Sequence, residues 1–218
     1  PAPTETAAPT PTPTPIPEAR IAQGDLALFQ GEYERGRQEY LKAALGSQDI
    51  EIQASAMLGI GRAYFEEDNY TQAVETFKSL INEHPANQSL ANAYYFLAES
   101  YMQQQMPAEA AEAYAKYLEL KPGVLDDIIQ KRRAEALMAA GNYTGAIEAY
   151  QAAITAGSDR GQALIKIGQA YAALSDFSNA VKTYLEAYNS TDNEYIKAQA
   201  NLLSGQIYME LGFPEQAY

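Results

Sequence analysis

The chain has 218 residues, of which 47% are hydrophobic, and this is enough for a buried core. Its formal net charge of −13 repels phosphate backbones and anionic lipid headgroups, which disfavours nucleic-acid and membrane-surface partners. No apolar run approaches the roughly 18 residues needed to span a bilayer. The lack of cysteine excludes disulfides and thiolate chemistry, and a single histidine, His84, leaves little for imidazole chemistry. We therefore expect no cofactor, no metal site and no enzymatic activity.

Residues 1–17 form a proline- and threonine-rich segment, PAPTETAAPTPTPTPIP, that holds seven of the eleven prolines. It lacks the apolar side chains for a core and many of the amide donors for helix or sheet, so it should extend as polyproline II. It fits either a spacer or a ligand strand. Because the sequence begins at Pro1, we expect that an export signal or lipid anchor was removed, and hence an extracellular or cell-envelope location. The candidate ligand residues are Pro9, Pro11, Pro13, Pro15, Ile16 and Pro17.

Residues 18–218 show helical periodicity, interrupted every 34 to 37 residues by a short turn. Seven residues before each turn glycine position stands a small residue: Gly24, Gly61, Ala98, Ala134, Gly168 and Gly205. Nine residues after the turn position stands a ring: Tyr40, Phe77, Tyr114, Tyr150 and Tyr184. Small residues facing rings predict antiparallel helices in close contact. The predicted hairpins are 18–50, 54–87, 91–123, 127–159, 161–190 and an incomplete 195–218.

This pattern resembles the tetratricopeptide repeat. Tyr64, Tyr101, Tyr171 and Tyr208 match the tyrosine of that family's first helix, and Pro85 and Pro122 match its closing proline. The resemblance implies an all-α, right-handed superhelical solenoid of about five and a half repeats that binds other proteins. The Pro/Thr leader followed by repeats also resembles the N-terminal helical region of bacterial soluble lytic transglycosylase-type exported proteins.

Solenoids of this family bind extended peptides in the groove lined by the first helix of each hairpin. The matching positions here are apolar, so they either pack between repeats or form an apolar, aromatic-bearing groove. The lysines and asparagines with which some members clamp a C-terminal carboxylate are missing from this set. The candidate groove residues are Leu58, Phe65, Tyr95, Met102, Ile128, Met138, Ile165, Leu202 and Met209.

The last repeat stops as its second helix begins, so an apolar face needs either more chain or another molecule to cover it. Together with the groove and the tail, this predicts an exported protein that assembles with its own copies head to tail, the tail docking on a neighbour. A scaffold region of a transglycosylase-type protein and a peptide-binding adaptor are the alternatives. The candidate end-to-end residues are Ile21, Leu28, Leu203, Tyr208, Phe213 and Tyr218.

Overall fold

The computed structural model describes residues 16–213 and residue 215, and this part of the chain contains eleven α-helices and no strand. The expectation of an all-α fold is therefore confirmed. The helices are α1 (Pro17–Phe29), α2 (Tyr33–Leu45), α3 (Ile50–Glu66), α4 (Tyr70–Glu83), α5 (Leu90–Gln103), α6 (Pro107–Leu120), α7 (Asp126–Ala139), α8 (Tyr143–Ala156), α9 (Arg160–Ala173), α10 (Phe177–Asn189) and α11 (Glu194–Glu210).

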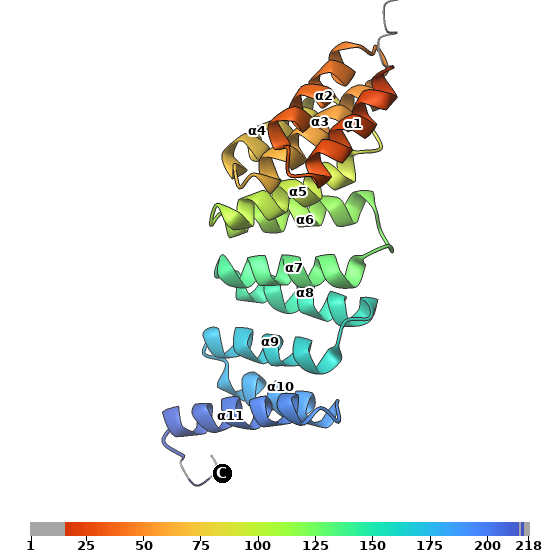
Figure 1. Ribbon diagram of the computed structural model, residues 1–218. Helices are drawn as coiled ribbons and strands as arrows, with labels where there is room; N and C mark the ends of the chain where they lie inside the picture. Colours follow the sequence, from red (N-terminus) through yellow and green to blue (C-terminus); the bar gives the residue numbers. More distant parts are fainter. Residues whose placement is uncertain (1–15, 214, 216–218) are drawn as a thin grey trace, which may run out of the picture.

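Each helix packs on the next along the chain, so that α1/α2, α3/α4, α5/α6, α7/α8 and α9/α10 form five hairpins, followed by α11. Figure 1 shows these hairpins stacked into an elongated, gradually turning array. We call α1, α3, α5, α7, α9 and α11 the first helices, and the even-numbered helices the second helices. The arrangement is the solenoid that the repeat pattern predicts.

A single left-handed residue ends each first helix. Its φ lies between 59° and 79°, a region that normally favours glycine. The next amide then closes the helix end, as where the Glu32 N–H donates to the Ala27 carbonyl over 2.8 Å. The six residues at this position are Gly31, Asp68, Gln105, Gly141, Ser175 and Gly212.

Polar caps start several second helices immediately after these turns. The Asn69 and Asn142 side chains accept from the amides of Gln72 and Gly145 over 3.4 and 3.0 Å. Such a cap satisfies an amide that has no partner inside the helix. The same short polar residues therefore end one helix and begin the next.

Rings of the second helices lie in sockets made by the small residues of the first helices. Tyr40 is fully buried, and a Cβ on Gly24 would lie only 2.6 Å from its ring, so only glycine fits there. Gly59 of the following hairpin also lies against the Tyr40 ring, and Gly168 forms an equivalent socket for Tyr184. These contacts fix the spacing of the helices.

Two clusters of buried side chains can be distinguished in the described part of the chain. A small N-terminal cluster contains Tyr40, Ala43 and Ala56. The main core runs from Ala73 in α4 to Ile207 in α11. The division falls at α3, which contributes Ala56 to the first group and partly buried residues to the second.

The proline-rich tail ends earlier than expected. Pro17 occupies the first position of α1, and Ile16 precedes it with an exposed side chain. Proline suits this position because the first helical amides need no partner within the helix. Among the described residues no helix is long and apolar enough to cross a membrane. The predicted residues Pro9, Pro11, Pro13, Pro15 and Tyr218 lie outside the described residues.

Candidate protein-interaction surfaces

The first helices follow one another along the solenoid, with direct contacts between α1 and α3, α3 and α5, and α9 and α11, and we call the side that they line the first-helix face. Near α3 and α5 this face is filled by rings. Phe65 and Phe96 lie edge to face with centroids 5.7 Å apart, and Tyr95 contacts Phe96 and Tyr117 at 5.3 and 6.1 Å. Aromatic contacts of this kind stabilise the junction between hairpins and leave ring surface on the face.

The predicted groove residues differ in how much surface they offer. Leu58, Phe65, Tyr95, Met102 and Met138 are half-buried. Ile128, Leu202 and Met209 are 46%, 62% and 57% exposed, so these three offer the largest apolar surface. Ile165 is fully buried in the main core, where it packs between hairpins and offers no surface to a partner.

The register also places a lysine where we expected an apolar residue. We call the small residue that faces a ring, such as Gly61, the socket residue. In the other hairpins the earlier of the predicted groove residues stands three positions before the socket residue, as Leu58 does before Gly61. In the fourth hairpin the socket residue is Ala134, so the equivalent position is Lys131; Ile128 lies one turn earlier on α7. Sequence reasoning missed Lys131 because it followed the apolar stripe and not the strict spacing.

Acidic side chains hold the buried ring hydroxyls at this face. The Tyr114 hydroxyl donates to Glu99 over 2.6 Å, and Arg132 pairs with the same carboxylate at 2.9 Å. The Tyr40 hydroxyl donates to Asp25 over 2.7 Å. Burial, and then these carboxylates, raise the pKa of both tyrosines well above the ordinary value. The signal in the sequence is an acid directly after the socket residue.

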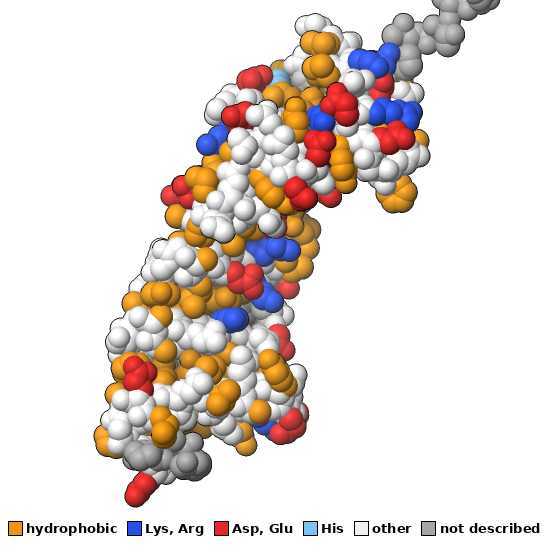
Figure 2. Space-filling view, turned by 60° about the vertical axis from the view of Figure 1, so that its left-hand side comes forward, with side chains coloured by type: hydrophobic (Ala, Val, Ile, Leu, Met, Phe, Trp, Pro, Cys, Tyr) orange, Lys and Arg blue, Asp and Glu red, His pale blue; other side chains and the backbone are white. Residues whose placement is uncertain are grey.

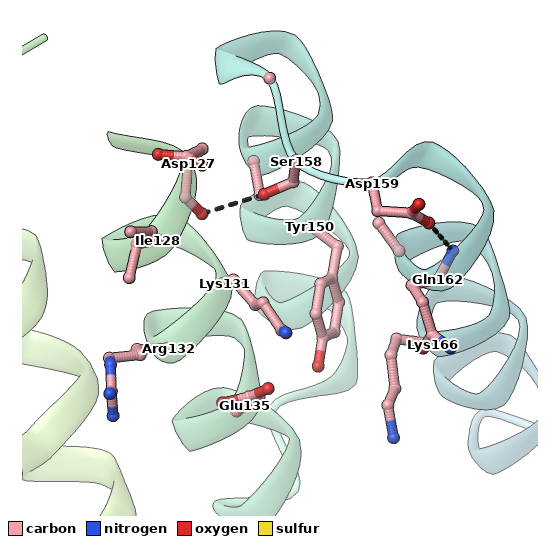
Figure 3. A pocket seen from close by; sticks show the side chains of 13 residues that line it. Asp127, Ile128, Lys131, Arg132, Glu135, Tyr150, Ser158, Asp159, Gln162 and Lys166 are labelled. Carbon is pink, nitrogen blue, oxygen red and sulfur yellow. Dashed lines mark hydrogen bonds between the residues drawn. The ribbon is translucent and has the colours of Figure 1, made fainter. Parts of the chain in front are cut away.

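A pocket of about 510 Å³ opens on this face between α7 and α9. Tyr150 and Ala153 of α8 also line the pocket, and Figure 3 shows Lys131 on one wall and Lys166 on the other. The Ser158 hydroxyl donates to the Asp127 carbonyl over 3.1 Å, and Asp159 caps α9 by accepting from the Gln162 amide over 2.7 Å.

Figure 2 shows a group of charged side chains midway along the solenoid. Basic side chains and an acidic one lie there among apolar groups. Six charged residues line the pocket. Arg132 is paired with Glu99, whereas Lys131 and Lys166 form no ion pair with any residue that the structure describes. Within residues 16–213 and 215, no group of acidic or imidazole side chains could hold a metal ion.

Both ends of the solenoid expose apolar side chains. At the first end, Leu26 and Phe29 of α1 are 53% and 91% exposed. The predicted residues of that end lie elsewhere: Leu28 is buried, and Ile21 packs half-buried against the N-terminal cluster. At the other end, Phe213 is exposed, and Leu203 and Tyr208 are half-buried.

The stacked hairpins and their exposed first-helix face define a helical-repeat solenoid. A family model described as Tetratricopeptide repeat matches residues 21–89 and 131–195, and a second with the same description matches residues 91–124. The chain therefore belongs to the tetratricopeptide repeat family, whose repeats are typically non-catalytic modules of protein–protein interaction.

Solved structures support the same fold. YrrB, described as a tetratricopeptide repeat protein with an unusual peptide-binding site, is 20% identical, with a TM-score of 0.64 over 83% of this chain and 89% of its own. MamA is 21% identical, with a TM-score of 0.63 over 80% of this chain and 91% of its own. Comparison with curated protein sequences gives no match. At these identities the likeness shows the fold alone.

Proposed function

We propose that this chain is a protein-binding scaffold that associates end to end with copies of itself. The observation that carries the proposal is the exposed outer face of α1. Ala19, Ala22, Leu26 and Phe29 recur at spacings of three and four residues, which places them on one stripe of that helix.

Equivalent positions in the later first helices indicate what such a stripe contacts inside the solenoid. The residue two positions after the socket residue is buried in every later first helix, because the preceding hairpin covers it: Ala63, Ser100, Ala136, Ala170 and Ile207. Leu26 is the equivalent residue of α1 and is 53% exposed. A helical hairpin of the same kind is therefore the natural occupant of this face, and the end of a second copy supplies one.

The opposite end supports the same proposal. Tyr195, Leu202 and Met209 of α11 stand seven residues apart, and they are 68%, 62% and 57% exposed. Residues spaced by seven share one helix face, so α11 presents an apolar row rather than scattered side chains. When the α1 surface of one copy joins the α11 surface of another, the resulting pair still has one free α1 surface and one free α11 surface. Further copies can therefore add, and the assembly can grow into a filament or tube.

The proline-rich tail is part of the proposal as a strand that straps one copy to the first-helix face of its neighbour. An extended proline-rich strand is recognised by aromatic surfaces, and the first-helix face offers Tyr95 and Phe65. Deleting residues 1–15 tests the strap: association should weaken without changing the helix content measured by circular dichroism. Association of equal strength after the deletion would reduce the tail to a spacer.

The test of the main proposal is the mass of the protein in solution as its concentration is raised. The double variant Leu26→Glu, Phe29→Glu places two charges on the α1 stripe and should remain a single copy, while the unchanged chain grows in mass by light scattering. Leu120→Glu is the control, because Leu120 is 45% exposed on α6, in the middle hairpin of the solenoid. A single-copy mass for the unchanged chain, or an equal loss in the control, would refute the proposal.

An exported location is also proposed rather than established. The proline- and threonine-rich segment of residues 1–17 supports it. A scaffold role beside a cell-wall lytic enzyme, or an adaptor role for a foreign peptide, would instead give a stable complex with that one partner. Fractionation of the producing cells, followed by immunodetection, tests the location.

A further inference from the structure

The pocket between α7 and α9 lies where these helices carry charged residues at a register position that holds a ring in α5. Two positions before the socket residue, α5 carries Phe96, whose ring packs against Phe65 and Phe77. The same position in α9 is Lys166. A lysine directs its ammonium group towards solvent, so the junction stays open, with Ala153 and Ala163 contributing only small side chains.

Lysines on both walls give this opening its chemistry. Lys131 is exposed and Lys166 is half-buried, and neither forms an ion pair with a described residue. In Figure 3 the Lys131 side chain extends from α7 towards the Tyr150 hydroxyl, while Lys166 extends along α9. Three acids and three bases line the pocket, but Lys131 and Lys166 are the two bases of this site that pair with no described carboxylate.

The acidic residues of the pocket are arranged around this site. Asp159 is engaged in capping α9, and Asp127 lies at the start of α7, where a carboxylate interacts well with the helix dipole. Glu135 lies one turn beyond Lys131 and pairs with no described cation. Charge therefore alternates along the α7 wall, from Asp127 through Lys131 to Glu135. A single acidic side chain on a ligand would match Lys131, the central residue of this row.

We propose that this pocket binds an extended protein segment by inserting one acidic side chain between Lys131 and Lys166. Ile128, 46% exposed at the rim, offers an apolar contact for the neighbouring residue of the segment. The ligand is an internal stretch of a chain and not its C-terminal carboxylate, because the pocket opens along the first-helix face. This site is separate from the two ends and goes beyond end-to-end association.

The test uses an array of acetylated, amidated nine-residue peptides, each with one central Glu and no other acid, beside a twin carrying Gln. We expect a subset of Glu peptides to bind the unchanged chain about three- to tenfold more tightly than their twins, since each partly exposed ion pair contributes only modestly. The variant Lys131→Met, Lys166→Met should lose this preference. The variant Lys116→Met, Lys121→Met, equal in charge and outside the pocket, should keep it.

A charge-swapped variant, Lys131→Glu with Lys166→Glu, gives a readout that a purely structural role would not move. Tested against a third version of each peptide with a central Lys, it should prefer that version to the Glu peptide. Binding should weaken as salt is raised, because ions screen the pair. The proposal is overturned if no peptide binds, if Glu and Gln twins bind alike, if the preference survives Lys131→Met, Lys166→Met, or if binding requires a free C-terminal carboxylate.

The two proposals fail separately. End-to-end association should be unchanged in the Lys131→Met, Lys166→Met variant, and peptide preference should be unchanged in the Leu26→Glu, Phe29→Glu variant. If the lysine variant also lost its association, the occupant of the pocket would be another copy at the joint, and the proposal of a separate segment would fail.

Discussion

At the scale of single residues, the socket rings are the parts on which each hairpin depends. Tyr184 is 2% exposed, and burial raises its pKa to about 12, above the ordinary tyrosine value of 10. Tyr40, Tyr114 and Tyr150 are shifted in the same direction. A buried ring hydroxyl of this kind must stay protonated for the hairpins to remain packed.

Stability should therefore fall at alkaline pH. Below pH 10 the Tyr184 hydroxyl is protonated in both states, whereas between pH 10 and about 12 it loses its proton more readily in the unfolded chain, which favours unfolding. Urea unfolding at pH 8, 10 and 11 should show a smaller loss for Tyr184→Phe than for the unchanged chain. Tyr195→Phe, which alters an exposed ring, is the control and should fall like the unchanged chain. Equal losses of stability in all three proteins would contradict the raised pKa of Tyr184 in the folded chain.

The limits of sequence reasoning are also clearest at this scale. Small residues and rings were found because close packing allows few alternatives at a socket. Lys131 was missed because an apolar neighbour, Ile128, lay one turn away and fitted the expected stripe. Burial of Ile165 could not be read from its position, because the same register leaves Leu202 exposed where no described hairpin follows. The exposure of a side chain depends on which neighbouring hairpins cover it. The spacing of residues along one helix does not give that information.

At the scale of elements, the left-handed position that ends each first helix is occupied by glycine in some hairpins and by a residue with a side chain in others. Gly31, Gly141 and Gly212 adopt it freely, whereas Gln105 and Ser175 adopt it with a Cβ, at φ values of 59° and 60°. A side chain in this region costs about 1 to 2 kcal/mol. The α5/α6 and α9/α10 turns are therefore strained relative to the α1/α2 and α7/α8 turns.

Replacing the strained residue should stabilise the fold. We expect Gln105→Gly to raise the free energy of unfolding by up to about 1 kcal/mol, because relief of strain exceeds the extra freedom of glycine in the unfolded chain. Gly141→Ala should lower it by about 1 kcal/mol for the opposite reason. Chemical unfolding followed by circular dichroism measures both. A destabilised Gln105→Gly would show that its side chain has contacts that outweigh the strain.

Element boundaries could be predicted well where the turn chemistry is regular. The turns at Gly31, Asp68, Gly141 and Ser175 lie between helices as expected, and all five complete hairpins are present. Pro17 was assigned to the tail because its neighbours are prolines, although a first helical position accepts proline readily. Composition thus overrode a local rule at that boundary.

At the scale of the whole molecule, the net charge of −13 opposes the proposed end-to-end association. Salt shortens the range of this repulsion from about 10 Å at 0.1 M to about 3 Å at 1 M, while apolar contacts at the ends persist. Association measured by sedimentation velocity should therefore strengthen with salt, and also as the pH approaches 4.5, the calculated pI. The Leu26→Glu, Phe29→Glu variant should respond to neither. Weaker association at high salt would indicate a joint held by charge.

The order of buried groups along the solenoid has a mechanical consequence. The small cluster of Tyr40, Ala43 and Ala56, with Ile21 of α1 packed against it, joins the first hairpin to α3, whereas the later hairpins share one long core. Under tension applied at the two ends, the N-terminal hairpin would open while the remaining hairpins kept their packing. In an end-to-end assembly this hairpin lies at the joint, so a pulled filament would lengthen there before its subunits parted.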